Sequence, residues 1–337
     1  MNEYQNQIIR ELLKKSSKIL ITNHIRPDGD CIGSALGFGL ALINAGKQVE
    51  IVNRDGIPGS FKHLPGSDLV VKKVSSSYDL SIVLDCSDLE RIGGVLGEEI
   101  PDINIDHHIT NLFFAKHNFV EPESAATAEL LAKSIPEWGL TIDEPIATCL
   151  LTGILSDTIG FRTSSVTPDT MVIASSLMSK GALLDDLYFR TLTQRSFEAV
   201  SLWGRGLSRL HLEGRLLWAE LLLEDRKKVH YPGNDDADLI NVLSGVQECD
   251  ISLIFVEQKG GKVKVSWRAQ PGWNVSKIAL QFGGGGHPAA AGAEINGDIE
   301  EVKKMVLEAT KKILLSGNSD HQLLEKVVIP PTEMGSE

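Results

Sequence analysis

Several acidic and histidine side chains of this sequence directly follow short apolar segments. The first group is His24, Asp28 and Asp30, which come soon after the apolar stretch Lys18–Thr22. A proline and a glycine lie between them and favour a tight loop that turns the three side chains toward one point. Carboxylates and imidazoles that meet at one point are typical of metal sites and of acid–base catalysis.

The same arrangement recurs further along the chain. The additional candidates are Asp85 after Leu80–Leu84, the run Asp106, His107 and His108 after Ile103–Ile105, and Asp157 at the end of a helical stretch. Taken singly, an Asp in such a position more often caps a helix than binds a metal. Several carboxylates in one crevice, however, would raise one another's pKa and destabilise the fold unless cations compensate. The sequence therefore predicts bound cations.

The mixture of nitrogen and carboxylate ligands indicates which cations these are. Ligands in this number suit two divalent ions, and mixed His and Asp ligation favours Mn²⁺, or Fe, Co or Zn, over Mg²⁺. Two ions roughly 3.5 to 4 Å apart lower the pKa of a shared water and polarise phosphoryl oxygens for in-line attack. The predicted reaction class is metal-assisted hydrolysis of a phosphoester.

The apolar segments around these residues predict an α/β domain. Strands are expected at Lys18–Thr22, Gln48–Asn53, Leu80–Leu84 and Ile103–Ile105, and helices at Asn6–Lys15, Asp30–Ala45, Ala125–Ser134 and Glu144–Leu155. Strands that are apolar on both faces and alternate with helices indicate a doubly wound parallel sheet covered on both sides. In such a sheet ligands bind beyond the carboxyl ends of the strands, where the candidate residues stand. Gly33 and Gly37, one helical turn apart, predict a close backbone approach.

The second half of the chain has a different pattern. Leu183–Leu210 is a long helical stretch, and strands of the hairpin type are expected at Gly214–Leu223 and Ile251–Trp267, with a final helix at Ile299–Leu315. We therefore expect a catalytic domain at residues 1–185, a helical linker at 186–211, a smaller α/β substrate-binding domain with a mixed sheet at 212–325, and a tail at 326–337.

A phosphate-binding region is predicted within the second domain. The window Lys259–Ala293 contains five basic and no acidic residues. Ser266 and Arg268 alternate with Trp267, so they share one face of a strand, and Arg suits bidentate phosphate contact. Four glycines at 283–286, followed by His287, allow backbone N–H groups to approach a phosphate, although a flexible loop is an equally good interpretation of that run alone.

These motifs resemble the DHH phosphoesterase family, which takes its name from the triplet Asp106, His107 and His108. The resemblance covers four motifs in order, and residues 282–292 are similar to the glycine–histidine signature of the DHH-associated domain. Within the family the chain is most similar to stand-alone RecJ-like proteins, the nano-RNases. These act as oligoribonucleases and as phosphatases of 3′-phosphoadenosine 5′-phosphate. Pyrophosphatase relatives share the metal residues but lack the glycine–histidine signature.

The resemblance implies a role for each residue. His24 and Asp28 bind one ion, Asp30, His107 and Asp157 bind the other, and Asp85 bridges both. Asp106 orients a neighbouring group, and His108 touches the scissile phosphate or assists the leaving oxygen. The implied substrate contacts are Ser266, Arg268, Gly284, Gly285, Gly286, His287 and Asn111. Related proteins often read Thr-Gly-x-Phe-Arg after the last Asp, whereas the glycine here is shifted by one, which puts any contact from Arg162 in doubt.

Composition excludes other classes of protein. The chain has 337 residues and a net charge of −12, so we expect short single-stranded oligoribonucleotides and nucleotides as partners and not long duplexes. Neither an export signal nor a membrane span is recognisable. Four dispersed cysteines fit the cytoplasm, and Cys31 and Cys86 are interpreted as buried fillers that point away from the ligands beside them. Trp267 and Trp273 are interpreted as packing residues and not as base platforms.

The sequence leaves two alternative functions and the oligomeric state open. A cyclic-di-AMP or linear dinucleotide phosphodiesterase would use the same metal residues. A catalytically silent nucleotide sensor would keep the fold, although it has no need of a complete set of ligands. Similar proteins often dimerise, but the sequence itself does not decide between a monomer and a homodimer.

Overall fold

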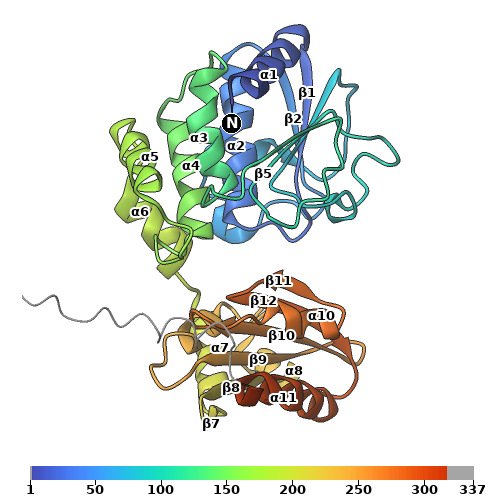
Figure 1. The fold of residues 1–337 in the computed structure, drawn as a ribbon, viewed down its shortest axis with the longest axis vertical. Helices are drawn as coiled ribbons and strands as arrows, with labels where there is room; N and C mark the ends of the chain where they lie inside the picture. The colour runs from blue at the N-terminus through green and yellow to red at the C-terminus, as the bar shows by residue number, and fades with distance from the viewer. Residues whose placement is uncertain (1, 317–337) are drawn as a thin grey trace, which may run out of the picture. The chain divides into compact units, whose positions relative to one another are not determined.

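The computed structural model describes residues 2–316, and the predicted tail at 326–337 lies outside them. The chain divides into two compact units between Gln194 and Arg195, within the segment expected to be the linker (Figure 1). Each unit has its own sheet and its own core.

Unit 1, residues 2–194, is built on a parallel sheet, as predicted. Its strands are β1 (Lys18–Thr22), β2 (Gln48–Val52), β3 (Val70–Val71), β4 (Leu80–Leu84), β5 (Ile103–Asp106) and β6 (His117–Val120). Their order is β3-β2-β1-β4-β5-β6, and all neighbours are parallel. The order reverses between β1 and β4. Ligands bind at the carboxyl ends of the strands at such a switch point.

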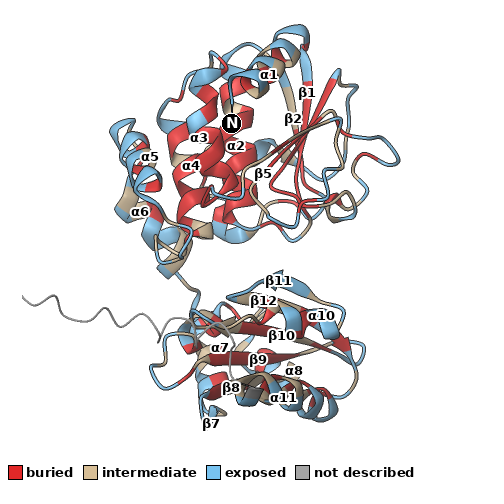
Figure 2. Cartoon of the chain, in the orientation of Figure 1, coloured by how far each residue is buried: buried red, intermediate tan, exposed pale blue. Residues whose placement is uncertain are grey.

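The helices of unit 1 lie over one face of this sheet (Figures 1 and 2). They are α1 (Glu3–Lys15), α2 (Gly29–Asn44), α3 (Thr127–Glu137), α4 (Glu144–Asp157) and α5 (Pro168–Ser179). The opposite face is covered by connecting segments, which contain no α-helix within the described part of unit 1. Short 3₁₀ turns at Gly59–Phe61, Ser67–Leu69 and Glu90–Ile92 interrupt those segments, and a small apolar cluster, including Val52, Val83 and Leu96, fills the space beneath them.

Helices α2 and α4 pack closely, as the two glycines predicted. A Cβ atom at Gly33 would lie 2.4 Å from the carbonyl oxygen of Cys149, and one at Gly37 would lie 2.8 Å from Leu150. Both distances are shorter than van der Waals contact, so only glycine permits this spacing. The close approach brings the beginning of α2 beside the end of α4.

The linker is helical but consists of two pieces. Helix α6 (Leu184–Tyr188) continues into a π-helical turn (Phe189–Thr193), and a separate helix α7 (Phe197–Leu207) follows. Ser196 has an extended backbone and its hydroxyl accepts a hydrogen bond from the N–H of Ala199, which makes it the N-cap of α7. The predicted helical stretch Leu183–Leu210 is therefore not one continuous helix, because a cap interrupts it.

Unit 2, residues 195–316, contains the predicted mixed sheet. Its strands are β7 (His211–Glu213), β8 (Leu216–Leu221), β9 (Ile251–Gln258), β10 (Lys262–Ala269), β11 (Gly285–His287) and β12 (Ala290–Asn296). Their order is β11-β12-β10-β9-β8-β7, and every pair is antiparallel except β8 with β9. Strands β9 and β10 form the predicted hairpin. Its turn contains Gly260 and Gly261, and both have backbone angles in the left-handed region.

Helices pack on both faces of the second sheet. They are α8 (Leu223–Val229), α9 (Leu239–Leu243), α10 (Ser276–Gln281) and α11 (Ile299–Ser316). Trp267 is fully buried in one core, and its indole N–H donates a hydrogen bond to Thr310 on α11 at 3.3 Å. This confirms that Trp267 is a packing residue. The other core contains Leu202 of α7 and Leu239 of α9.

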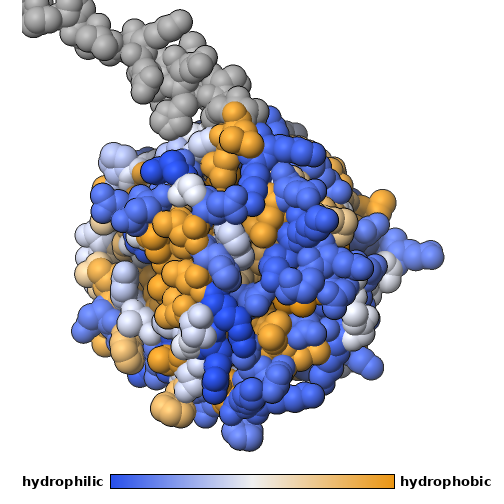
Figure 3. Space-filling model, turned by 90° about the horizontal axis from the view of Figure 1, so that it is seen from below, coloured by the Kyte–Doolittle hydropathy of each residue, from blue (hydrophilic) through white to orange (hydrophobic). Residues whose placement is uncertain are grey.

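The surface mixes polar and apolar residues. In the space-filling view the visible face is largely hydrophilic, with hydrophobic residues in scattered groups (Figure 3). Among the described helices, none is both long enough and apolar enough to cross a membrane.

Candidate metal centre

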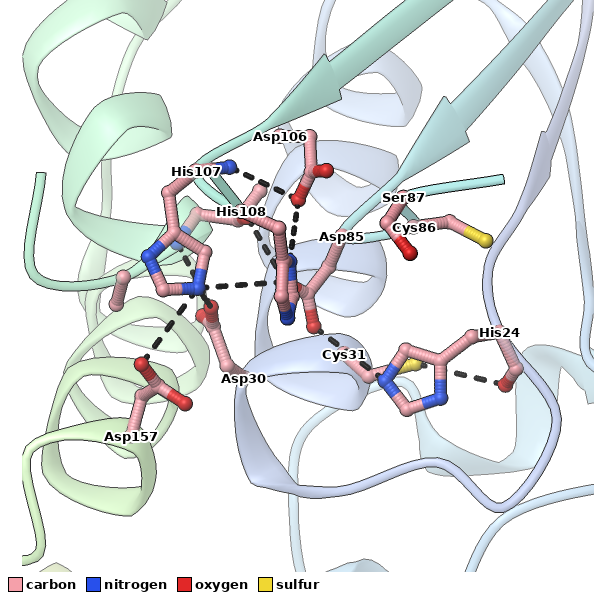
Figure 4. Close-up of polar contacts among 12 residues, drawn as sticks. His24, Asp30, Cys31, Asp85, Cys86, Ser87, Asp106, His107, His108 and Asp157 are labelled. Atoms are coloured by element: carbon pink, nitrogen blue, oxygen red, sulfur yellow. Dashed lines mark hydrogen bonds and ion pairs between the residues drawn. The ribbon is translucent and has the colours of Figure 1, made fainter. Parts of the chain in front are cut away.

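The structure brings together acidic and histidine side chains from five separate segments of unit 1 (Figure 4). His24 follows β1, Asp85 follows β4, and His107 and His108 follow β5. Asp30 comes from the first turn of α2 and Asp157 from the last residue of α4. All six therefore meet at the carboxyl ends of the central strands.

Asp85 lies at the centre of the cluster. Its Oδ2 is 3.6 Å from Nε2 of His24, and its Oδ1 is 3.8 Å from Nε2 of His107. Oδ1 also accepts a hydrogen bond from the hydroxyl of Thr127 at 2.9 Å. The two oxygens thus face two different imidazoles. This is the arrangement expected of a carboxylate that bridges two cations.

His107 has the surroundings of a metal ligand. Its Nδ1–H donates to the carbonyl of Ser124 at 3.2 Å, which leaves the lone pair on Nε2. Nε2 is buried without a hydrogen-bond partner among the described residues, and it lies 3.5 Å from Asp157 Oδ2 and 4.0 Å from Asp30 Oδ2. A buried imidazole nitrogen that faces carboxylates without a donor between them fits a shared cation.

His24 and Asp28 form the other side of the cluster. The Nδ1–H of His24 donates to the carbonyl of Ile25 at 2.8 Å, so Nε2 faces the carboxylates. Asp28 Oδ2 lies 3.9 Å from that Nε2. Asp28 Oδ1 accepts the N–H of Cys31 at 3.0 Å and caps α2. Asp28 therefore serves as a helix cap with one oxygen and faces the candidate metal site with the other.

Asp106 supports the cluster from behind. Its Oδ1 accepts hydrogen bonds from His108 Nδ1 at 2.7 Å and from the N–H of His107 at 2.8 Å. Its Oδ2 accepts from Asn111 Nδ2 at 2.6 Å. Both oxygens are thus used, and Asp106 holds the two histidines in place, consistent with the orienting role that the resemblance implied.

Asn111 contacts other residues of unit 1 through its side chain. Its side chain is buried, its amide N–H₂ is directed at Asp106, Asn104 and the carbonyl of Cys86, and its Oδ1 accepts the N–H of Phe113. This side chain fixes Asp106 and the turn that follows the histidines. These contacts indicate a positioning role for Asn111, whereas its substrate contact stays a prediction.

The electrostatics of the cluster favour bound cations. Burial, together with the charges of Asp85 and Asp157, raises the pKa of Asp30 well above its usual value. Burial, with Asp28 and Asp85 nearby, raises the pKa of Asp157 to about 6. Burial alone would lower the pKa of His108, but Asp106 and Asp85 raise it to about 9. Without a cation, Asp30, Asp157 and His108 therefore hold their protons to a higher pH than usual.

Two supporting residues were missed by sequence reasoning. Asp30 accepts hydrogen bonds from the backbone N–H groups of Thr127 at 2.7 Å and Ala128 at 2.9 Å. These N–H groups open helix α3, where partial positive charge favours an anion. The start of a helix near Thr127 was visible in the sequence, but which carboxylate it would face was not.

Cys31 lies closer to the cluster around Asp85 than the sequence predicted, since its side chain was expected to point away from the neighbouring ligands. It stands in the first turn of α2, and its Sγ belongs to a group with ligand atoms of His24 and Asp85 that all lie within 4.8 Å of one another. The thiol contacts the carbonyl of His24, and burial raises its pKa well above the usual value. The prediction assumed that neighbouring side chains point in opposite directions, as in a strand. It fails because Cys31 lies in a helix. Cys86 is buried and its Sγ contacts the carbonyl of Asp88.

In unit 2, the candidate substrate residues lie on and beside β10. Arg268 Nε donates to Asn241 Oδ1 at 3.2 Å and Nη1 donates to the carbonyl of Trp267 at 3.0 Å. Ser266 is buried on the same face of the strand, two residues away. His287 ends the short exposed strand β11.

The glycine run leads into the exposed edge strand β11, and a side chain at two of its glycines would clash with β12. A Cβ atom at Gly284 would lie 2.2 Å from the carbonyl of Gly292, and one at Gly286 would lie 2.5 Å from the carbonyl of Ala290. Gly285 has open space on its Cβ side. Close pairing with β12 therefore accounts for Gly284 and Gly286, and it leaves Gly285 free of that constraint.

The segment after Asp157 adopts an uncommon conformation. Ile159, Gly160 and Phe161 have φ values of +49°, +69° and +67°, so a β-branched residue occupies the left-handed region. A Cβ atom at Gly160 would lie 2.5 Å from the ring of Tyr188 on α6. The shifted glycine thus makes room for the linker, and the exposed Arg162 follows it.

The parallel sheet, the cluster around Asp85 and the division into two units are typical of a two-domain phosphoesterase of α/β type. The comparisons with known proteins agree. Residues 18–154 match the model of the DHH family, N-terminal domain, and residues 234–314 match the DHHA1 domain. The chain belongs to the DHH family and is a hydrolase.

Two curated relatives are similar over most of the chain. A Thermus thermophilus protein named bifunctional oligoribonuclease and PAP phosphatase NrnA is 35% identical over 91% of this chain and 94% of its own length. The cyclic-di-AMP phosphodiesterase PdeA of Listeria monocytogenes is 25% identical over 90% of this chain, which spans 49% of that protein.

Solved structures share the fold. An exopolyphosphatase-related protein from Bacteroides fragilis is 27% identical, with a TM-score of 0.88 and coverage of 94% of this chain and 98% of its own. RecJ of Thermus thermophilus, solved in complex with Mn²⁺, has a TM-score of 0.52 at 14% identity and covers 91% of this chain and 54% of its own.

Proposed function

We propose that this protein is a metal-dependent phosphoesterase that hydrolyses short oligoribonucleotides to mononucleotides and also removes phosphate from 3′-phosphoadenosine 5′-phosphate. The observation that carries the proposal is the convergence of carboxylates and imidazoles around Asp85, with both of its oxygens facing different histidines. The likeness to the Thermus oligoribonuclease and PAP phosphatase over nearly the full length supports the substrate class.

Two divalent ions are the proposed cofactors, and Mn²⁺ is the proposed metal. Asp30, His107 and Asp157 would hold one ion, His24 and Asp28 the other, and Asp85 both. Imidazole nitrogen in both sets favours Mn²⁺ over Mg²⁺, which prefers oxygen ligands. Such a pair supplies a hydroxide near neutral pH and neutralises charge on the phosphoryl group.

The chain's own residues position and move protons around the phosphoryl group. Asp106 fixes the orientation of His108 through Nδ1, so Nε2 of His108 is the atom that can contact the phosphate or protonate the leaving oxygen. The raised pKa of His108 keeps a proton available for that step. Thr127 holds Asp85, and Ser124 fixes the tautomer of His107.

Unit 2 is proposed to hold the substrate. Arg268 and Ser266, with Gly284, Gly285, Gly286 and His287, would bind a terminal phosphate and the adjoining nucleotide. The five cations of the window 259–293 suffice for a few nucleotides, and the net negative charge of the chain disfavours long duplexes. We propose residues 1–185 as the catalytic domain, 212–325 as the substrate domain and 186–211 as the linker.

The proposed activity is tested with a length series. Labelled ribonucleotides of two to ten residues, and 3′-phosphoadenosine 5′-phosphate, are incubated with Mn²⁺, and mononucleotide and phosphate release are measured. We expect turnover that declines with length, and a loss of at least about 10³-fold in Asp85→Asn because one bridging carboxylate is removed. The exposed Asp169→Asn serves as a matched control. No release from any of these substrates would overturn the proposal.

A second candidate is favoured by the likeness to the cyclic-di-AMP phosphodiesterase. Cyclic di-AMP, its linear product pApA and pGpG are compared with the oligomers as substrates. A kcat/KM on the cyclic dinucleotide above that on the short oligomers would favour this alternative. Tight binding without turnover in saturating Mn²⁺ would instead indicate a silent nucleotide sensor.

Two further properties are proposed, the cellular compartment and the oligomeric state. Four buried free thiols suit a reducing compartment, and we propose that the protein acts in the cytoplasm. We also propose a homodimer, on the basis of the resemblance alone. Analytical ultracentrifugation measures the oligomeric state directly.

A further inference from the structure

The guanidinium of Arg268 has different partners from those of Arg209 and Arg195, two other arginines of unit 2. Arg209 forms two hydrogen bonds with Asp225, and Arg195 pairs with Asp238 at 2.7 Å. Arg268 has no carboxylate within 4.0 Å among the described residues, and its partners are the neutral oxygens of Asn241 and Trp267. A neutral acceptor orients a guanidinium without neutralising it.

Part of that guanidinium remains available. Nε and Nη1 are each used once, and Nη2 donates to no acceptor among the described residues and is not among their buried unpaired atoms. Burial lowers the pKa of Arg268, while Asp236 and Asp238 offset part of that effect from a distance. A desolvated cation that contacts no carboxylate and has a free edge is suited to a charged ligand that arrives from solvent.

Asn241 owes its position to an unusual loop. It lies in the middle of the five-residue helix α9, whose Leu239, Ile240 and Leu243 are buried. The two residues before this helix, Ala237 and Asp238, have φ values of +52° and +66°. The left-handed region is unfavourable for a non-glycine residue, so the surrounding contacts must hold the loop in this form.

Those contacts come from several directions. Asp235 accepts the hydroxyl of Tyr231 at 2.6 Å and the N–H of Ala237 at 3.0 Å. The carboxylate of Asp236 is buried and accepts the N–H of Ile240 at 3.0 Å. Trp203 of α7 donates its indole N–H to the carbonyl of Ala237 at 2.8 Å. The loop is thus fixed at both its backbone and its side chains.

We propose that Asn241 is a positioning residue of the substrate site: it orients the guanidinium of Arg268 so that its Nη2 edge receives the terminal phosphate of a short oligonucleotide, and the loop at 235–238 exists to place it. This inference rests on the proposed function, because it takes Arg268 to be the phosphate contact. It adds a residue outside the predicted motifs, on a different element from Arg268.

The test separates orientation from charge and from folding. KM and kcat are measured for a 5′-phosphorylated diribonucleotide and for the same diribonucleotide without that phosphate. Binding is also measured at equilibrium in the Asp85→Asn background, so that affinity is read without turnover. The variants are Asn241→Ala, Asn241→Asp and Arg268→Ala, with Val242→Ala as the control, because Val242 is 45% exposed on the same helix.

We expect Asn241→Ala to raise KM for the phosphorylated substrate about 10-fold at unchanged kcat. Its KM for the substrate without the phosphate should stay within about 2-fold of the parent value. Asn241→Asp keeps an acceptor but adds a charge that competes with the phosphate, so its KM should rise at least as much. Combining Asn241→Ala with Arg268→Ala should add nothing to the effect of Arg268→Ala alone.

Two results would overturn the inference. If Arg268→Ala weakens binding of the phosphorylated substrate but both Asn241 variants bind like the parent, the positioning role fails and the proposed function stands. If Arg268→Ala itself has no effect on binding, the phosphate contact assigned to Arg268 under the proposed function fails, and the role of Asn241 fails with it.

Discussion

At the residue scale, the charges around Asp85 explain the pKa values of the acids in the candidate metal centre. Burial alone would raise the pKa of Asp85, but the contact with His24 and the charges of His108 and His107 lower it. For the surrounding acids Asp30 and Asp157, burial and the neighbouring carboxylates outweigh the groups that lower the pKa, and the pKa values of both are raised. One carboxylate is therefore kept ionised at the expense of its neighbours, and a divalent cation would relieve that conflict.

This charge balance predicts an unusual pH dependence for the metal-free protein. Asp157 and Asp30 have raised pKa values, so the native state binds more protons than the unfolded state above pH 4, and stability falls as pH rises. His108, with a pKa raised to about 9, has the same sign between its ordinary value of 6.5 and pH 9. Metal ligands must lose protons to bind, so in the presence of Mn²⁺ the stability should rise with pH instead of falling.

Thermal unfolding in a chelator and in excess Mn²⁺, at intervals from pH 5 to pH 8.5, measures this. The expected outcome is a Tm that falls with pH in the chelator and a Mn²⁺-induced increase in Tm that grows with pH. An Asp157→Asn variant serves as the control, because it removes one of the titrating acids and should flatten the fall. A Tm that rises with pH in the chelator would contradict the charge balance described here.

At the element scale, the contact between α2 and α4 sets the geometry of the centre. Asp30 begins α2 and Asp157 ends α4, and a Cβ atom at Gly33 would lie 2.4 Å from the backbone of α4. Gly33→Ala should therefore separate the helices, lower the free energy of unfolding by about 1–3 kcal/mol and weaken metal binding. Gly204, within α7, has no atom within 4 Å of its Cβ position.

Gly204→Ala is the matched control for that prediction. It should stabilise the protein by about 0.5–1 kcal/mol, because alanine has the better helix propensity and meets no obstacle. Urea unfolding gives the free energies, and Mn²⁺ titration gives the affinities. Equal stability changes in the two variants would mean that the close approach of α2 and α4 does not matter.

At the scale of the whole molecule, all the candidate metal ligands belong to one unit. Unit 1 has its own core and all six clustered side chains, whereas Arg268 and the glycine run belong to unit 2. A ligand present at 100 times its Kd stabilises the unit that binds it by about 2.7 kcal/mol. We therefore expect Mn²⁺ to raise the unfolding temperature of unit 1 by roughly 5–10 °C, at about 2–4 °C per kcal/mol.

Calorimetry with and without Mn²⁺ tests this expectation. The scan should contain two transitions, of which only the one assigned to unit 1 moves. Asp85→Asn should abolish that movement and leave the second transition in place. A shift of both transitions by the same amount would show that the units unfold as one cooperative body.

The sequence by itself determined the parallel sheet, the mixed sheet and the catalytic candidates, because strand periodicity and the position of polar residues after strands are local signals. The tertiary structure alone decided which carboxylate faces which imidazole. It gave Asn111 a supporting role, brought Cys31 toward the centre, split the linker at Ser196 and placed Asn241 against Arg268. These outcomes depend on contacts between residues distant in sequence, and a pattern within one segment carries no information about its partner.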